Sequence, residues 1–295
     1  MGGSEEGRGA EARAAEADGA GLLAGAVDLH VHGGPDVVAR RHSDLELARR
    51  AKAAGMAAIV LKSHVESTVG RAAAASEASG FDVRGGIVLN PGACGGIDPE
   101  VVRTSLELGA RVIWMPTTAS AAHLERFPGA APGAARPAAR AAVLERGAAR
   151  DICRLVAEAG ALVASGHLGR EETTVLAEEA SAAGARLLLQ HPDYSVPGLG
   201  AEAQAELAAR FPTATFERCA FVASPGAPEP LPIERMVEAM QAVGLERNVV
   251  SSDLGQPANP PYPEGFVAFA AALESAGIAR ADLAPMLSTR AASLV

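Results

Sequence analysis

The chain of 295 residues has few cysteines, few aromatic residues and almost no lysine. Cys94, Cys153 and Cys219 are widely spaced and form no Cys-x-x-Cys pair, which argues against a disulfide framework and fits a reducing compartment. The sequence also lacks an apolar run of about 18 residues, and it lacks a charged leader that precedes an apolar segment and a cleavage site. We therefore expect a cytoplasmic protein that has no membrane partner.

Basic residues are fewer than acidic ones, 26 Lys and Arg against 35 Asp and Glu, so the formal net charge is −9 at pH 7. No basic run and no alternation of basic with aromatic residues is present, which argues against a nucleic-acid partner. Hydrophobic residues make up 48% of the chain but aromatic residues only 3%, so Ala, Val and Leu must fill the core. We expect the chain to act on a small-molecule substrate. We also expect it to form a homo-oligomer.

The first residues differ in composition from the rest of the chain. Residues 1–24 are mostly Gly, Ala, Glu and Arg, and we predict a disordered tail there, followed by a single domain over residues 25–295. From Ala26 onward, short runs rich in Val, Ile and Leu alternate with Ala-rich amphipathic stretches, a pattern typical of βαβ units. The amphipathic stretches predict helices at 44–54, 99–108, 152–160, 171–184, 201–210 and 233–244.

The number of strands indicates the architecture. The apolar runs end near residues 32, 64, 90, 116, 167, 191, 219 and 253, and eight βα units in roughly 250 residues predict a (β/α)₈ TIM barrel. An open doubly wound sheet is the alternative. That fold would normally have a glycine-rich phosphate loop after the first strand, whereas the segment Gly33-Gly34-Pro35-Asp36 predicts only a turn.

One interval between strands is longer than the others, at 51 residues from 116 to 167. It contains residues 117–150, which are rich in Ala, Pro, Gly and Arg and include His123. We predict an inserted loop after the fourth strand. Since it follows the carboxyl end of a strand, it is either a lid over the catalytic face or a plain insertion.

Polar residues collect where the apolar runs end. The carboxyl ends of parallel strands open onto one face, so side chains from distant parts of the sequence converge there. His30 and His32 are two residues apart and share a face of their strand, which makes them a chelating pair, and Lys62 and His64 repeat that spacing. Neutral imidazoles and carboxylates suit Zn²⁺ and its neighbours. The complete set of such residues is His30, His32, Lys62, His64, His167, His191, Glu217 and Asp253.

Lys62 is informative because the chain has 24 Arg and only 2 Lys. A sequence that uses arginine wherever a generic cation serves has a reason to keep a lysine at this strand end. An ammonium can lose its proton or be modified when it is buried, and a guanidinium cannot. The alternative is a structural ion pair between Lys62 and Glu217 or Asp28.

These residues resemble the amidohydrolase superfamily of metal-dependent hydrolases. The resemblance covers about residues 26–295 and rests on an Asp-x-His-x-His first strand, histidines that close the fifth and sixth strands, and an aspartate that closes the eighth. It is closer to an uncharacterised branch of that superfamily, through the segments Asp28-Leu-His-Val-His-Gly-Gly-Pro-Asp36, Leu61-Lys-Ser-His-Val-Glu-Ser67, Ile113-Trp-Met-Pro-Thr117, Gly166-His-Leu168, His191-Pro-Asp193 and Ser252-Asp-Leu-Gly-Gln256.

The resemblance implies a role for each matched residue. It implies that His30 and His32 bind a divalent metal, with Zn²⁺ expected before Mn²⁺ or Fe²⁺, and that His167 and His191 bind the same ion or a second one. Asp253 would contact the metal and shuttle the proton.

The chain departs from the superfamily pattern at the fourth strand. Trp114-Met115-Pro116-Thr117 lacks the carboxylated lysine or glutamate that bridges two metals in many members. Either one ion is bound, or Lys62 or Glu217 supplies the bridge from another strand. The candidate catalytic residues are Asp253, His191, Lys62 and His64.

The function that follows is a metal-dependent hydrolase, in which metal-activated water attacks an amide, ester, lactone or related bond of a small molecule. A decarboxylase or lyase of the same superfamily and a metal-binding barrel without turnover are the alternatives. Arg40 and Arg41 either clamp a carboxylate or phosphate of the substrate or belong to a solvated helix face.

Overall fold

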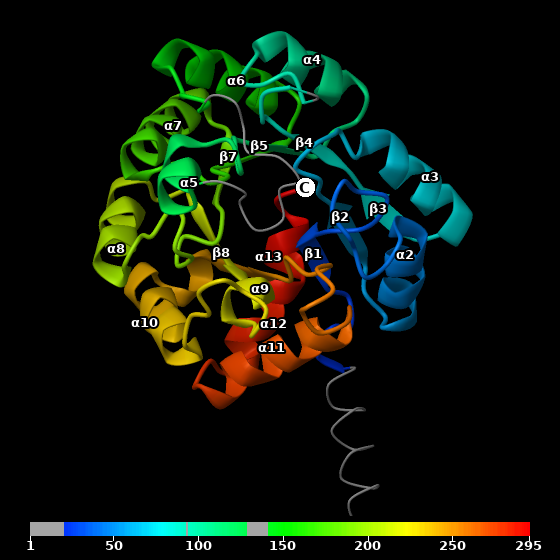
Figure 1. Ribbon diagram of the computed structural model, residues 1–295. Helices are drawn as coiled ribbons and strands as arrows, with labels where there is room; N and C mark the ends of the chain where they lie inside the picture. The colour runs from blue at the N-terminus through cyan, green and yellow to red at the C-terminus, as the bar shows by residue number, and fades with distance from the viewer. Residues whose placement is uncertain (1–20, 93, 129–140) are drawn as a thin grey trace, which may run out of the picture.

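The computed structural model describes residues 21–92, 94–128 and 141–295, and its strands form a ring surrounded by helices (Figure 1). Every pair of neighbouring strands is parallel. All eight predicted strands are present, and one of them is divided in two at Gly85. The strands are β1 (Val27–Val31), β2 (Ala58–Leu61), β3 (Asp82–Arg84), β4 (Gly86–Val88), β5 (Val112–Trp114), β6 (Leu162–Ala164), β7 (Arg186–Leu189), β8 (Thr215–Cys219) and β9 (Asn248–Ser251).

Backbone hydrogen bonds close the ring. One run of strands has the order β1-β2-β3 and the other has the order β4-β5-β6-β7-β8-β9, and only Gly85 separates β3 from β4. At the other junction, the Asp253 N–H donates to His30 O at 2.7 Å and the His32 N–H donates to Leu254 O at 2.8 Å. The fold is therefore a (β/α)₈ barrel, as predicted, and an open sheet is excluded.

Helices cover the outside of the barrel (Figure 1). The six predicted helices are present, although the one predicted to begin at residue 152 begins at Arg146. The sequence analysis did not predict the helices over 69–79, 264–275 and 280–287. The helices are α2 (Asp44–Ala53), α3 (Val69–Ser79), α4 (Pro99–Glu107), α5 (Ala121–Arg126), α6 (Arg146–Glu158), α7 (Arg170–Ala183), α8 (Ala201–Arg210), α9 (Ala220–Ala223), α10 (Ile233–Val243), the short 3₁₀ helix η1 (Leu245–Arg247), α11 (Glu264–Ser275), α12 (Arg280–Leu287) and α13 (Thr289–Ala292).

Local capping explains where several helices begin. The Ser43 hydroxyl accepts a hydrogen bond from the Glu46 N–H at the start of α2, and the Asp98 carboxylate accepts one from the Glu100 N–H at the start of α4. Pro99 occupies the first turn of α4, where its missing N–H costs nothing. These caps fix where the helices start after the loops on the carboxyl side of the barrel.

Aliphatic side chains and Trp114 fill the interior of the barrel. We call this group the interior cluster, and it consists of Val27, Leu29, Ala58, Val60, Val88, Val112, Trp114, Leu162, Ala164, Leu188, Val249, Ala291 and Leu294. It draws on seven strand segments and on the last residues of the chain, whereas two other clusters mix strand and helix residues and lie between the strands and the surrounding helices. The interior of the barrel is therefore a packed core and not a pore.

The last residues of the chain close one end of this core. Ala291 and Leu294 join the interior cluster, and the Arg186 guanidinium donates to Leu294 O at 3.0 Å. Arg186 is the first residue of β7, so α13 and the residues after it lie at the amino ends of the strands. Polar side chains can therefore gather only at the opposite, carboxyl end.

Two predicted features fall partly outside the described residues. Residues 1–20 of the predicted tail lie outside them, and Leu22 and Leu23 are buried in the core, so the folded body begins before residue 25. Residues 129–140 of the predicted insertion also lie outside the described part, and α5 and the start of α6 occupy much of the rest of 117–150. In the described ranges, every helix is too short or too polar to cross a bilayer.

Candidate metal centre

All eight candidate residues lie at the carboxyl end of the barrel. Seven of them are buried and His64 is half-buried. Six of them line one cavity of about 280 Å³, namely His30, Lys62, His64, His167, His191 and Asp253. His32 and Glu217 are not among its lining residues. The prediction that strand ends would bring these distant residues together is therefore correct.

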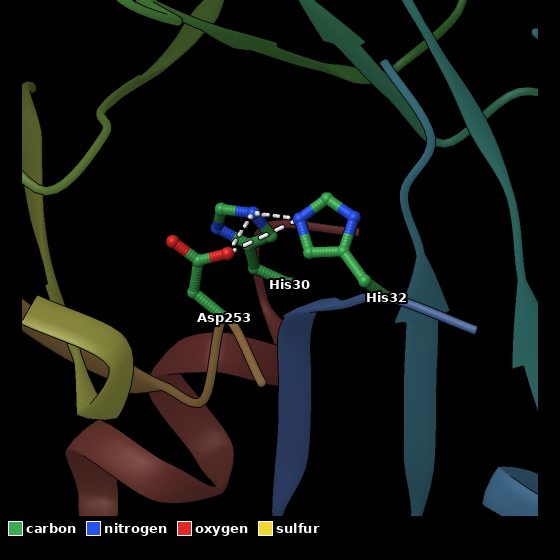
Figure 2. A group of neighbouring side chains, drawn as sticks. All are labelled: His30, His32 and Asp253. Atoms are coloured by element: carbon green, nitrogen blue, oxygen red, sulfur yellow. Dashed lines mark hydrogen bonds and ion pairs between the residues drawn. The ribbon is translucent and has the colours of Figure 1, made fainter. Parts of the chain in front are cut away.

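His30, His32 and Asp253 form a compact triangle (Figure 2). The two Nε2 atoms are 3.2 Å apart, and Asp253 Oδ1 lies 3.0 Å from the Nε2 of His30 and 3.1 Å from that of His32. His30 lies in β1 and His32 directly follows that strand, while Asp253 follows β9, the neighbour of β1 in the ring. Three donor atoms of the kinds that bind transition metals thus meet at one point.

The charges of the triangle are strongly coupled. Burial opposes ionisation of Asp253, but the imidazoles of His30 and His32 outweigh burial and hold the pKa of Asp253 well below its usual range. Burial lowers the pKa of His32 well below its usual value, which keeps this ring neutral. Burial also disfavours the charged form of His30, but the carboxylates of Asp253 and Glu217 raise its pKa. The triangle therefore contains an ionised carboxylate and at least one neutral imidazole.

The arrangement fits a divalent metal ion better than it fits hydrogen bonding alone. His30 Nε2 is approached by His32 Nε2, Asp253 Oδ1 and Lys62 Nζ, all within 3.0 to 3.2 Å, although one ring nitrogen serves one in-plane partner. A tetrahedral ion with bonds of about 2.0–2.1 Å holds its ligand atoms about 3.3 Å apart. The edges of the triangle are close to that spacing, so His30, His32 and Asp253 suit one ion.

Glu217 lies on the other side of the His30 ring and does not join the triangle. Its Oε2 atom is 3.5 Å from His30 Nδ1, and Cys219 Sγ is 4.0 Å from the same nitrogen. A carboxylate that faces Nδ1 favours the tautomer in which Nε2 keeps its lone pair for a metal. The geometry thus favours Glu217 as a residue that orients His30, and not as the bridge between two ions that the sequence left open.

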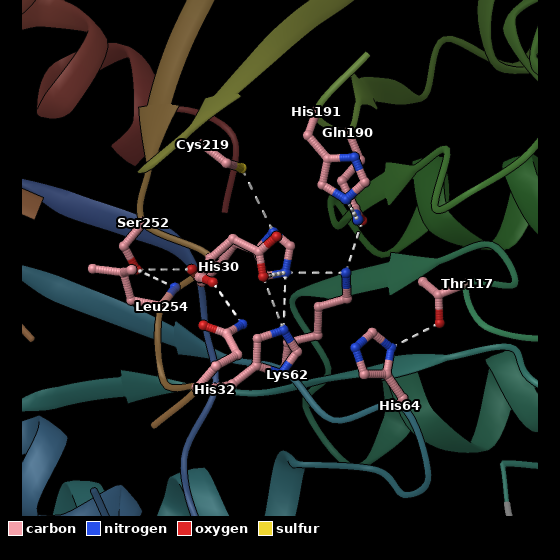
Figure 3. Close-up of polar contacts among 12 residues, drawn as sticks. His30, His32, Lys62, His64, Thr117, Gln190, His191, Cys219, Ser252 and Leu254 are labelled. Carbon is pink, nitrogen blue, oxygen red and sulfur yellow. Dashed lines mark hydrogen bonds and ion pairs between the residues drawn. The ribbon is translucent and has the colours of Figure 1, made fainter. Parts of the chain in front are cut away.

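Lys62 contacts the triangle from β2 (Figure 3). Its Nζ donates to Gln190 Oε1 at 2.9 Å, lies 3.1 Å from His30 Nε2 and stands 5.3 Å from the centre of the Trp114 ring. Burial lowers the pKa of Lys62 to about 8, although the Asp253 and Glu217 carboxylates oppose this shift. Lys62 is therefore a polar neighbour of His30 and not a distant structural cation.

The remaining histidines form the far wall of the cavity. His167 and His191 have ring centres 5.0 Å apart, and neither gives an atom to the compact metal-type groups found among the described residues. His64 Nδ1 lies 2.8 Å from Thr117 Oγ1 (Figure 3). Burial lowers the pKa of His191 to about 4, so this imidazole is neutral at pH 7.

His123 is a cavity residue that the sequence analysis noted only as part of a long loop. Its Nδ1 lies 2.9 Å from Nδ1 of His167, and its ring stacks on His167 with centres 4.9 Å apart. The Ser120 side chain caps α5 by accepting from the His123 N–H. A serine directly before a run of good helix formers, here Ala121–Arg126, is a recognisable N-cap, and this signal could have placed His123 on a short helix.

The backbone is strained at two of the candidate residues. His191 and Asp253 are the two non-glycine residues with positive φ in the described ranges, at 23° and 49°. Such conformations cost free energy and concentrate at functional sites. Gly166, with φ of 57°, precedes His167, and an added Cβ there would lie 2.2 Å from Met115 O.

Asp28 supports the site through the backbone. The pairing register of β1 is irregular between Asp28 and Val31. Its Oδ1 accepts from the backbone N–H of His30 at 3.1 Å and from that of Ser252 at 2.9 Å. Asp28 therefore ties β1 to the segment that leads from β9 to Asp253.

A comparison with known families matches residues 25–216 to a family of unknown function, DUF6282. The chain belongs to this family. The matched part of this DUF6282 chain includes β1 to β7 and His30, His32, Lys62, His64, His167 and His191, while Glu217 and Asp253 lie beyond it. No curated protein matches the sequence.

Solved structures share the fold of the DUF6282 chain. An amidohydrolase from Pseudomonas aeruginosa aligns with a TM-score of 0.57 at 11% identity, over 94% of this chain and 98% of that one. A mutant PTE-like lactonase from Deinococcus radiodurans gives 0.57 at 17% identity, over 93% and 96%. A 2,6-dihydroxybenzoate decarboxylase from Rhizobium gives 0.52 at 13% identity, over 92% and 98%.

At these identities the likeness shows the fold alone. It confirms the predicted (β/α)₈ barrel, and the family match agrees with the expectation of an uncharacterised family. Since the three neighbours differ in their named activities, the reaction must be argued from the site.

Proposed function

We propose that the chain is a metal-dependent hydrolase that cleaves an amide, ester, lactone or related bond of a small molecule. The observation that carries this proposal is the triangle of His30, His32 and Asp253, of which His30 and Asp253 line the cavity. A divalent ion bound there, with Zn²⁺ as our first expectation, would supply Lewis acidity toward a substrate oxygen and lower the pKa of water to about 7.

Asp253 is the residue that we assign to proton transfer. Its Oδ1 faces the two imidazoles, whereas its Oδ2 has no hydrogen-bond partner among the described residues. Because the carboxyl is ionised and lines the cavity, Oδ2 can accept a proton from the attacking water and return it to the leaving group. The positive φ of Asp253 keeps this carboxylate at the mouth of the barrel.

We assign substrate binding, and not proton transfer, to Lys62, His191 and His64. Lys62 places an ammonium beside His30, where it can stabilise negative charge that develops on a substrate oxygen. His191 and His64 are neutral because burial lowers the pKa of each ring, so they act as hydrogen-bond donors or acceptors and not as cations. The His167 ring is tilted against that of His191, with centres 5.0 Å apart, and also lines the cavity.

Three further expectations belong to this proposal. We propose one metal ion per chain, because the second compact group of metal-type atoms, His30, Glu217 and Cys219, shares His30 with the triangle. We also propose a homo-oligomer and a cytoplasmic location, which rest on the sequence alone. Size-exclusion chromatography with light scattering tests the oligomeric state.

The proposal is tested by turnover on a panel of lactones, amides and esters by the metal-loaded protein, with CO₂ release from aromatic carboxylic acids measured in parallel. We expect hydrolysis that is lost on chelation and restored by Zn²⁺ or Mn²⁺. Release of CO₂ without hydrolysis would assign a decarboxylase instead. Inertness of the fully metallated protein on both panels would favour a barrel that binds metal without turnover.

A further inference from the structure

Arg40 is a cavity residue whose charge the proposed chemistry does not use. Its side chain is 3% exposed and lines the same cavity as His30, Lys62 and Asp253. The sequence left open whether Arg40 and Arg41 bind substrate or belong to a solvated face. The structure separates the two arginines, because only Arg40 reaches the cavity.

The neighbouring Arg41 has a structural role. Its guanidinium donates to Pro257 O and, at 2.9 Å, to Asn259 O. The Arg41 N–H donates to Gly255 O at 2.8 Å, so this segment is fastened to the loop that follows Asp253. Arg41 therefore holds in place the loop from which Arg40 projects.

The guanidinium of Arg40 has spare donors. Its Nε donates to Asp36 Oδ2 at 2.8 Å, and its Nη2 lies 2.8 Å from the same oxygen but has no well-aligned acceptor. Arg40 has no other polar partner in the part of the chain that the structure describes. Since an arginine has five N–H donors, most of them are unused in a nearly buried side chain.

The charge of Arg40 acts on the site. It helps to lower the pKa of His32, His64 and Lys62, in each case after the larger effect of burial. Two cationic side chains, Arg40 and Lys62, line the cavity, and the one carboxylate there, Asp253, faces the imidazoles. An anionic group entering the cavity would therefore meet two cationic side chains, of which Arg40 is paired with Asp36 along one edge only.

We infer that Arg40 determines specificity by binding a carboxylate group of the substrate. The planar fork of a guanidinium matches a carboxylate with two parallel hydrogen bonds. Asp36 neutralises part of the charge, so the free edge suits a monoanion better than a phosphate dianion. Val38, Phe221 and Pro228 also line the cavity and suit an apolar body attached to that carboxylate.

This inference rests on the proposed function for the reaction but not for the binding, so binding is the quantity to measure. Phenylacetate and its neutral isostere phenylacetamide are titrated by calorimetry into metal-loaded and chelator-treated protein. The variants are Arg40→Gln and the control Arg103→Gln, which changes an exposed arginine that pairs with Glu100 and does not line the cavity. Metal content and circular dichroism of each variant establish that it is loaded and folded.

We expect the wild-type protein and Arg103→Gln to bind phenylacetate more tightly than phenylacetamide by about tenfold or more. Arg40→Gln should lose that preference, with or without metal, while Arg40→Lys recovers part of it because it keeps the charge without the fork. On a carboxylate-bearing substrate, Arg40→Gln should raise KM more than it lowers kcat.

An unchanged preference for phenylacetate in folded Arg40→Gln would overturn the inference, as would tighter binding of inorganic phosphate than of phenylacetate by the wild-type protein. A lower melting temperature with no change in preference would assign Arg40 a structural role and also overturn it. Arg40-dependent binding in a protein that hydrolyses nothing would sink the proposed function and leave this inference standing. Hydrolysis without any dependence on Arg40 would do the reverse.

Discussion

The two ends of the barrel are built from the same strands, but one end is packed with apolar side chains and the other is lined with buried polar ones. At the amino end, Ala291 and Leu294 pack into an aliphatic interior cluster, and Arg186 binds the carbonyl groups of Ser293 and Leu294. At the carboxyl end, buried histidines, carboxylates and a lysine crowd around one cavity.

Unsatisfied atoms mark the difference between the two ends. Buried atoms without a hydrogen-bond partner at the carboxyl end include Nδ1 of His32, Nδ1 of His191 and both carboxylate oxygens of Glu217. The two strained non-glycine residues, His191 and Asp253, lie there as well. Buried polar groups without partners lower the free energy of unfolding. Their presence at the carboxyl end is therefore typical of a functional site.

The largest effect should come from Asp253→Asn, which changes the carboxyl end without altering its shape. Asparagine tolerates the positive φ at this position, so the fold should remain. Because the ionised carboxylate is lost, kcat/KM should fall by about 10²–10⁴-fold and metal content should fall with it. Steady-state kinetics and elemental analysis measure both. Normal turnover and full metal content in this variant would remove Asp253 from the site.

Lys62→Arg tests whether the site requires an amine at this position. The longer guanidinium cannot occupy the buried space beside His30 and Gln190 without moving one of them, so kcat/KM should fall by about 10²-fold. The melting temperature should change little in comparison. Retention of metal and activity, measured beside His32→Ala, would show that Lys62 forms only a structural pair.

Leu162→Ala tests the opposite end. Leu162 is fully buried in the interior cluster, and its truncation should lower the free energy of unfolding by about 2–5 kcal/mol. Metal content and kcat/KM of the folded protein should stay near wild type. Denaturant unfolding measures the first quantity, and loss of metal in the folded variant would mean that the two ends are not independent.

The smallest effect should come from Arg186→Ala. This side chain donates to Ser293 O at 3.2 Å and to Leu294 O at 3.0 Å from a partly exposed position. Its removal should cost about 0.5–1.5 kcal/mol of unfolding free energy and no activity. Arg103→Ala, which breaks an exposed pair with Glu100, is a matched control that should cost less. Equal losses of unfolding free energy in the two variants would show that the contacts of Arg186 with the end of the chain do not stabilise the fold.

The sequence predicted the strand ends well because period-two alternation and the change from apolar runs to polar residues are local signals. His30, His32 and Asp253 could be placed together since parallel strands end on one face. The hydrogen bonds of Asp28 to the backbone N–H groups of His30 and Ser252 could not be predicted, because they depend on the irregular register of β1 and on how it meets the segment after β9.

Features set by tertiary contacts were also missed. Two adjacent arginines read alike in the sequence, yet the bonds of Arg41 to the loop after Asp253 direct Arg40 alone into the cavity. His123 was treated as part of a loop, although a short capped helix carries it to His167. Neither contact has a periodic signature, so only the folded arrangement shows them.

The central claim is that His30, His32 and Asp253 bind a metal ion, and the metal content of the purified protein tests it most directly. After growth and dialysis with Zn²⁺, inductively coupled plasma mass spectrometry should find about one equivalent of divalent metal per wild-type chain. A folded His32→Ala variant should hold far less, whereas Arg103→Gln, which changes an exposed arginine, should match wild type. A wild-type protein that binds no metal, or a His32→Ala variant that binds as much as wild type, would contradict the account.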